Sequence, residues 1–149
     1  MTPANPAHRD THLEGNTPPN KRLHIGLWIA QGLLALVFTM AGAFKLLTPI
    51  DELAGKMSWI QESSPWLVRF IGAAEFAGAL GLILPSLTRI APKLTALAAL
   101  GLAVVMVLGA GVHVMHGEAN RLPVNVILGA LAAFVAWGRL RAAPIPPRN

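Results

Sequence analysis

The chain of 149 residues contains no cysteine, and only 13% of its residues are charged. Without cysteine the protein cannot form a disulfide, perform thiol chemistry or hold an iron–sulfur cluster through thiolates. The low charge content, together with 54% hydrophobic residues, argues against an ordinary soluble domain. This length suits one domain and leaves no room for a catalytic module beside a membrane anchor. We therefore expect an integral membrane protein.

Four long apolar segments predict four transmembrane helices, at about residues 25–47, 67–84, 94–115 and 122–139. The first and third segments are apolar on every face, whereas each helix of a soluble bundle would keep a polar stripe. The first segment is not a signal peptide, because its apolar core is too long and no small-residue cleavage site follows it. The second segment is expected to end before Pro85, since proline removes a helical hydrogen bond. The predicted fold class is an all-α transmembrane four-helix bundle.

Polar segments flank and connect the predicted spans. Residues 1–22 and 142–149 are too poor in apolar residues to bury a core, so we expect disordered tails on either side of a membrane domain at residues 23–141. Residues 48–61 place apolar side chains at helical spacing opposite charged ones, with Thr48 as the expected helix cap. This pattern predicts a short amphipathic helix on the membrane surface, which either just covers the bundle end or gates a cavity there.

The Lys and Arg residues are distributed unequally between the two sides of the predicted bundle. Eight of them fall on the side of both termini: Arg9, Lys21, Arg22, Arg89, Lys93, Arg139, Arg141 and Arg148. Four fall on the opposite side: Lys45, Lys56, Arg69 and Arg121. The positive-inside rule then predicts a multi-pass protein of the bacterial inner membrane with both termini in the cytoplasm. The net charge of +5 is then mostly this asymmetry, with attraction to anionic lipid as a by-product, and nucleic-acid binding is not needed to explain it.

Polar side chains also occur within the predicted spans, where an unpaired polar group is costly. Glu75 lies about 12 Å into the second span, and a lone carboxylate at that depth costs several kcal/mol. Lys45, His113 and Asn125 occupy the outer halves of the other three spans. Gln31 shares a helix face with Lys45. We expect these five residues to form one interior polar site, in which Glu75 is either protonated or paired.

Structural roles are the alternative for each of these residues. Glu75 paired with Lys45 or His113 would be an interhelical tie that fixes helix register. Lys45 also lies close enough to the surface to extend to the lipid headgroups. Asn125 and Gln31 would then be no more than hydrogen-bonding contacts between neighbouring helices.

Two histidines near the end of the third span resemble metal ligands in their spacing. His113 and His116 lie three residues apart, and Glu118 follows closely. His116, however, is expected at the membrane interface. We therefore predict no metal site.

The chain resembles the DoxX-like family of small four-helix membrane proteins over about residues 23–139. The matching stretches are GLWIAQGLLALVFTMAGAFKL, IGAAEFAGALGLILP, AALGLAVVMVLGAGVH and VNVILGALAAFVAWGR. The family takes its name from a subunit of a membrane thiosulfate:quinone oxidoreductase, and other members are linked to redox partners or to membrane-protein assembly. The resemblance places Lys45, Glu75 and His113 at polar positions of the family. The lack of cysteine argues against a thiol-exchange role here.

Three functions remain open from the sequence. The first is an accessory inner-membrane bundle whose site around Glu75 binds a small apolar or quinone-like molecule, or seats a partner helix. The second is the membrane subunit of a quinone-linked oxidoreductase, in which Glu75 and His113 pass protons and a separate protein supplies electrons. The third is a proton-coupled carrier, which would need to form a homo-oligomer to enclose a pathway. No redox centre of the chain's own is visible, so quinone is the one cofactor considered.

Overall fold

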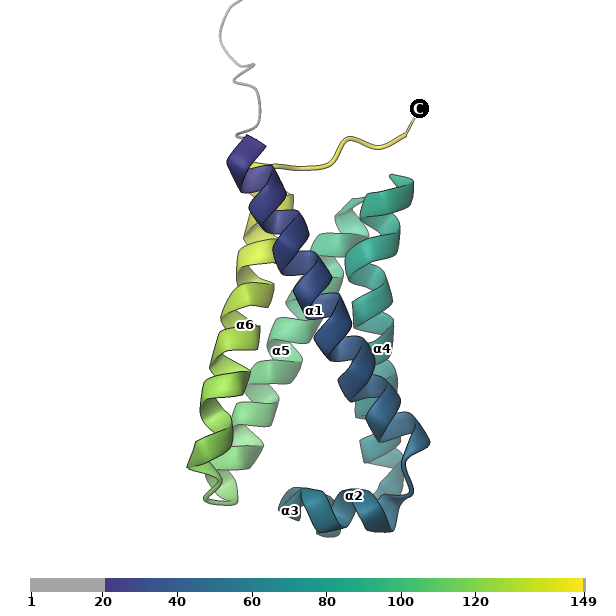
Figure 1. Cartoon of the computed structure of the whole chain (residues 1–149), viewed down its shortest axis with the longest axis vertical. Coiled ribbons are helices and arrows are strands. Elements are labelled where there is room, and N and C mark those ends of the chain that lie inside the picture. Colours follow the sequence, from purple (N-terminus) through teal and green to yellow (C-terminus); the bar gives the residue numbers. More distant parts are fainter. Residues whose placement is uncertain (1–20, 149) are drawn as a thin grey trace, which may run out of the picture.

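A computed structural model describes residues 21–148, and this part of the chain contains helices and no strand. The four long helices are α1 (Lys21–Leu47), α4 (Pro65–Thr88), α5 (Lys93–Met115) and α6 (Leu122–Trp137). The shorter elements are α2 (Ile50–Lys56), α3 (Ser58–Gln61), the 3-10 turn η1 (Ala119–Arg121) and the π-helical turn η2 (Gly138–Ala142). Helices α2 and α3 lie across one end of the bundle (Figure 1). Most of the predicted amino-terminal tail, residues 1–20, lies outside the described residues.

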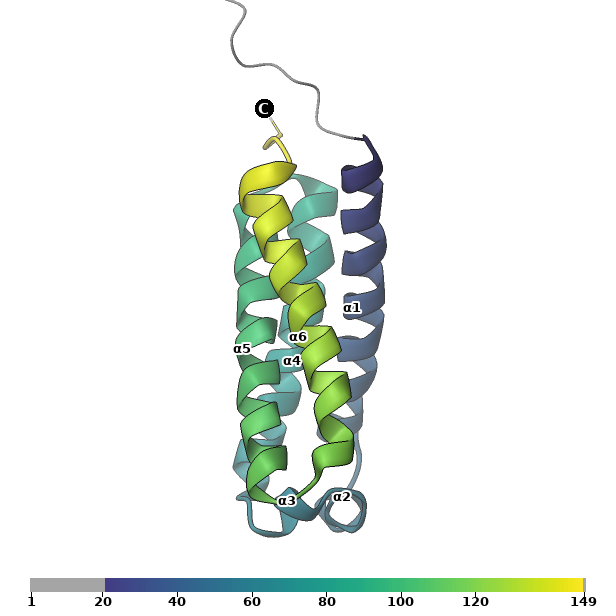
Figure 2. The ribbon, with the colours of Figure 1, turned by 90° about the vertical axis from the view of Figure 1, so that its left-hand side faces the viewer.

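Four helical segments are long and apolar enough to cross a membrane. They are Lys21–Leu47, Pro65–Thr88, Lys93–Met115 and Ala119–Ala142. Their outward faces carry large apolar side chains, such as Leu36 at 59% and Val107 at 70% exposure, which a soluble protein would bury. The long helices run side by side (Figure 2). The predicted all-α transmembrane four-helix bundle is confirmed.

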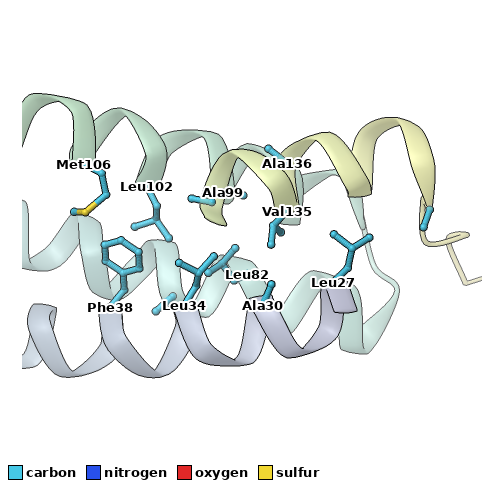
Figure 3. Packing of buried hydrophobic residues seen from close by; sticks show 13 residues of the cluster. Leu27, Ala30, Leu34, Phe38, Leu82, Ala99, Leu102, Met106, Val135 and Ala136 are labelled. Atoms are coloured by element: carbon cyan, nitrogen blue, oxygen red, sulfur yellow. The ribbon is translucent and has the colours of Figure 1, made fainter. Parts of the chain in front are cut away.

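The bundle consists of two helix pairs. Helix α1 packs most extensively on α4, and α5 packs most extensively on α6. The main apolar core joins the two pairs in the half where α1 begins and α6 ends, and there Leu27, Leu82 and Val135 are fully buried (Figure 3). Towards α2 and α3 the two pairs diverge (Figure 1). The core therefore holds one end of the bundle together and leaves the other end to be closed by different contacts.

Helix α4 continues past Pro85 to Thr88, so the prediction that the second span ends before this proline is wrong. Proline cannot donate a backbone hydrogen bond and disturbs the carbonyls of the preceding turn. The side chain of Gln31 donates a hydrogen bond to the carbonyl oxygen of Leu82, three residues earlier, at 2.6 Å. The carbonyl that loses its helical donor at Pro85 is that of Gly81, and Gln31 donates to the next carbonyl in the same turn, so a side chain from a neighbouring helix supports the backbone beside the proline.

The amphipathic segment forms two short helices rather than one. Met57 has an extended backbone, with φ −137° and ψ 110°, and separates α2 from α3. No side chain caps the start of α2, so the expected cap by Thr48 is wrong. The apolar face of this segment packs against α4, in a small cluster whose buried members are Leu53, Ile60 and Val68. Apolar contacts therefore attach α2 and α3 to the α1/α4 pair.

The carboxy-terminal segment contacts the bundle. The composition of residues 142–149 predicts a disordered tail, yet Ala143 is fully buried. The backbone N–H of Arg148 donates a hydrogen bond to the carbonyl oxygen of Arg89 at 3.1 Å. A single small apolar residue and a backbone contact hold this segment, and neither leaves a pattern in the sequence.

Two glycines let α1 and α4 approach closely. A Cβ atom at Gly42 would lie 2.7 Å from the carbonyl oxygen of Gly72 and 2.8 Å from the amide nitrogen of Phe76. A Cβ atom at Gly72 would lie 2.8 Å from the Cβ of Lys45. Small residues allow such backbone contact between membrane helices, where lipid supplies no hydrophobic drive for association.

We predict that Gly42→Ala destabilises the protein by about 1–3 kcal/mol, because the added methyl group meets backbone atoms that cannot move independently. Gly32→Ala in the same helix is the matched control, since a Cβ atom there meets nothing within 4 Å. The measurement is the free energy of unfolding in detergent micelles. Equal stability of the two variants would contradict the close approach of α1 and α4.

Candidate functional site

A cavity of about 560 Å³ lies where the two helix pairs diverge. Its wall comes from α1, α4, α5 and α6, and residues Met57 and Trp59 of the connecting segment contribute from the end of the bundle. Phe38 and Met106, at one end of the core in Figure 3, also line it. Most of the lining is apolar, and its charged or hydrogen-bonding side chains, tryptophan aside, are Lys45, Glu75, His113, Arg121 and Asn125. The volume is within the range of small-molecule sites, about 300–1,000 Å³.

Lys45 of α1 and Glu75 of α4 form an ion pair at the cavity wall. Lys45 Nζ lies 2.7 Å from Glu75 Oε2. The two residues are only 9% and 4% exposed, so the lysine does not extend to the lipid headgroups. Taking either charge out of water costs several kcal/mol, and the short contact with the opposite charge offsets part of that cost. Of the two states considered for Glu75, the structure shows the paired one.

Arg69 of α4 strengthens the same helix contact. Its guanidinium donates a hydrogen bond to the backbone carbonyl oxygen of Lys45, near the carboxyl end of α1. The last carbonyls of a helix have no partner within the helix, and a basic side chain can satisfy one of them. Arg69 therefore holds the backbone from which the Lys45 side chain reaches Glu75.

His113 of α5 lies at the cavity wall and is part of a chain of hydrogen bonds to α3. Its Nδ1 atom lies 2.6 Å from Glu118 Oε2. The hydroxyl of Ser58 donates to the other carboxylate oxygen of Glu118. These hydrogen bonds, with that from Ser58 the stronger cause, hold the pKa of Glu118 below its usual range. The chain Ser58–Glu118–His113 thus links α3 to the α5/α6 pair.

Two further polar contacts join the α2/α3 segment to the residues that connect α5 and α6. Arg121 donates a hydrogen bond to the carbonyl oxygen of Lys56 at 3.2 Å. His116 Nε2 lies 3.4 Å from Glu62 Oε2. A hydrogen bond with the carbonyl oxygen of Val112, more than the nearby carboxylates, raises the pKa of His116. Helices α2 and α3 are therefore held on one side by apolar packing and on the other by polar contacts.

Within residues 21–148 no group of three or more His, Asp or Glu side chains is placed to hold a metal ion. His113 and His116 instead bond to separate partners, Glu118 and the Val112 carbonyl.

Asn125 of α6 both joins two helices and lines the cavity. Its Nδ2 atom donates to the carbonyl oxygen of Met106 in α5 at 3.3 Å. Gly109 leaves room for the amide, because a Cβ atom there would lie 2.8 Å from Asn125 Nδ2. The two roles considered for Asn125 are therefore compatible.

Gln31 does not reach the cavity. It is fully buried in the other half of the bundle, where its Oε1 atom accepts a hydrogen bond from Arg139 Nε at 2.5 Å. Gln31 and Lys45 share a helix face, but fourteen residues along a helix correspond to about 21 Å. The five polar residues therefore do not form one site, because Gln31 lies too far along α1 from the others. Lys45, Glu75, His113 and Asn125 line the cavity, and Gln31 belongs to a second cluster.

The second cluster centres on Arg139, which is only 5% exposed. Besides Gln31, its guanidinium contacts His24 Nδ1 at 3.3 Å and the Ala143 carbonyl oxygen at 3.3 Å, and it lies over the Trp28 ring. Among residues 21–148 no carboxylate pairs with it. The sequence indicated only that Arg139 is one of the basic residues flanking the spans, because an arginine directly after a transmembrane segment is common.

The sequence also does not reveal the roles of Ser58 and Arg121 at the cavity end. Ser58 is hydrogen-bonded to Glu118, 60 residues away in the sequence, and Arg121 is hydrogen-bonded to the backbone of Lys56, 65 residues away. A serine and an arginine in polar connecting segments carry no signal of such contacts.

Four apolar spans, a close α1/α4 contact and a cavity with polar groups at its wall define a small polytopic membrane protein. The sequence model of the DoxX-like family matches residues 29–135. This match covers most of the chain, which therefore belongs to the DoxX-like family. Comparison with curated proteins and with solved structures finds no match.

We predict that Lys45→Met destabilises the protein by about 3–5 kcal/mol, because Glu75 is left as a buried charge without its partner. The double variant Lys45→Met/Glu75→Gln should recover a large part of this loss, since neither buried charge remains. Free energies of unfolding of the single and double variants form a double-mutant cycle. Simple additivity of the two single effects would contradict the ion pair.

We predict that acidification detaches α3 from the α5/α6 corner. A carboxyl group with a lowered folded-state pKa stabilises the fold above its unfolded pKa, and this contribution is lost as the pH falls through the folded pKa. Fluorescence of Trp59, next to Ser58, should therefore change below the usual pKa of a glutamate, about 4.3. Glu118→Gln should keep the emission of the parent protein at neutral pH and show no such transition, because its amide group can make both contacts and does not titrate. An unchanged transition in that variant would exclude Glu118 as its cause.

Proposed function

We propose that the protein is a membrane-embedded binding protein, without catalytic activity of its own, that holds a small and largely apolar molecule with a polar head. The observation that supports this proposal is the cavity of about 560 Å³, whose wall is mostly apolar with polar side chains from all four long helices or their ends. Apolar walls with a few polar groups that fix orientation are typical of small-molecule sites.

The chemistry of the lining favours an amphiphilic ligand. The apolar side chains suit a ring or a hydrocarbon tail, while Asn125 and Arg121 offer donors and His113 offers an acceptor. A quinone-like molecule, with carbonyl groups on a ring and an apolar tail, belongs to this class. A partner helix suits the space less well, since a helix with its side chains is about 10–12 Å across.

The proposed setting is the bacterial inner membrane, with both termini in the cytoplasm. The excess of Lys and Arg on the terminal side of the bundle supports this orientation. Helices α2 and α3 would then cover the cavity at the outer surface. A redox or other membrane-protein partner, or a second copy of this chain, would use the bilayer-facing helices.

A second candidate function is that of a membrane subunit in a quinone-linked oxidoreductase. The observation that favours it is the Glu118–His113 contact, which connects the cavity wall to the polar end of the bundle. Reduction of a quinone to a hydroquinone would take protons by this route and electrons from a separate redox protein. Quinone reduction by the isolated chain with a donor protein would favour this candidate over simple binding.

Tryptophan fluorescence tests binding directly, because Trp59 lines the cavity and the other three tryptophans do not. With Trp28, Trp66 and Trp137 replaced by phenylalanine, decylubiquinone should quench the remaining fluorescence in a saturable manner. Ala74→Phe fills part of the cavity and should weaken binding by roughly tenfold or more.

The matched control is Ala77→Phe, at an exposed position of the same helix that does not line the cavity. This variant should bind decylubiquinone as the parent protein does. Quenching without saturation, or equal weakening by both substitutions, would count against ligand binding in the cavity.

A further inference from the structure

His113 presents a ring nitrogen that the protein itself does not use. Its Nδ1 atom is bonded to Glu118. Its Nε2 atom makes no hydrogen bond within residues 21–148, and it is not among the buried side-chain atoms that lack a partner. His113 lines the cavity, and this second nitrogen is neither hydrogen-bonded in this part of the chain nor fully buried, so it can contact a molecule bound there.

Glu118, which is bonded to Nδ1 of the His113 ring, determines whether Nε2 donates or accepts a hydrogen bond. Glu118 is ionised at neutral pH, because the hydrogen bonds from Ser58 and His113 hold its pKa low. An ionised carboxylate can only accept, so Nδ1 of His113 donates in this contact. In the tautomer with its hydrogen on Nδ1, Nε2 carries a lone pair and acts as a hydrogen-bond acceptor.

The other charged or amide side chains at the cavity wall each make at least one contact with the protein. Lys45 and Glu75 contact each other. Asn125 donates to a backbone carbonyl of α5, and Arg121 donates to one at the end of α2. Within the described part of the chain, His113 Nε2 is one of three acceptor atoms on cavity-lining side chains that receive no hydrogen bond from the protein, with Glu75 Oε1 and Asn125 Oδ1.

We propose that His113 accepts a hydrogen bond from a hydroxyl group of the ligand, and that the cavity thereby selects hydroxyl-bearing apolar molecules, such as alkylphenols, over analogues without that hydrogen. This inference rests on the proposed function, namely that the cavity binds a small apolar molecule. Ser58 and Glu118 are positioning residues in this account, since they act on the ligand through the imidazole ring.

The Glu118→Gln variant separates this proposal from a merely structural role of the hydrogen-bond chain. A glutamine side chain can accept from Ser58 with its oxygen and donate to His113 Nδ1 with its amide group. The ring hydrogen then moves to Nε2, which becomes a donor. The selectivity of the cavity for a ligand hydroxyl group should be lost or reversed. The two hydrogen bonds of residue 118, to Ser58 and to His113, remain.

The experiment compares two probes that differ in one hydrogen-bond donor, 4-octylphenol and its methyl ether 4-octylanisole. Isothermal titration calorimetry in detergent gives the dissociation constant of each. The parent protein should bind the phenol about tenfold more tightly, the ratio expected for one hydrogen bond that leaves a buried acceptor unpaired when lost. His113→Leu should bring the ratio near one.

His116→Gln is the matched control, because His116 is a neighbouring histidine that does not line the cavity, and its ratio should equal that of the parent. Equal affinities of the parent for both probes would overturn the proposal, as would a ratio that survives in Glu118→Gln and His113→Leu. Binding of decylubiquinone without selective binding of the phenol would refute the role of His113 and leave the proposed function standing. Absence of binding for all three compounds would refute both.

Discussion

The ion pair between Lys45 and Glu75 is the contact on which the arrangement of this membrane protein depends. A carboxylate at this depth requires an opposite charge or a proton, and Lys45 Nζ at 2.7 Å supplies the charge. The two helices can bring the groups together because Gly42 and Gly72 allow backbone contact one turn away. Arg69 holds the end of α1 in place from α4. Electrostatics and close packing thus act on the same pair of helices, and each supports the other.

The cavity follows from how the two helix pairs are joined. An apolar core unites them at the end where α1 begins and α6 ends, and there a separate polar cluster around Gln31 and Arg139 satisfies buried groups. At the other end α2 and α3 bridge the pairs, through apolar contacts to α4 and polar contacts to the α5/α6 corner. The space between is lined by the ion pair and by His113, so the cavity and the closure of the bundle share the same residues.

Hydropathy was sufficient to predict the four spans, because each needs a long apolar run regardless of its neighbours. The depth of Glu75, Lys45, His113 and Asn125 could also be counted from the sequence, and the structure brings all four to one cavity wall. Gln31 was misplaced because a shared helix face was given more weight than axial distance. The end of α4 was misplaced because a rule for proline was applied without the neighbouring side chain that supports the backbone beside it. The roles of Ser58, Arg121 and Arg139 depend on contacts between distant segments, which periodicity does not encode.

The most direct test of this account is a solid-state magnetic-resonance measurement of the distance between the Lys45 ammonium nitrogen and the Glu75 carboxyl carbon, in the full chain reconstituted in lipid bilayers. The account predicts strong dipolar coupling, because the nitrogen contacts an oxygen bonded to that carbon, and the coupling is absent in the Lys45→Met protein. A Glu75 signal that shows no coupling to lysine and contacts the lipid acyl chains instead would contradict the ion pair, and with it the interior site built around that pair.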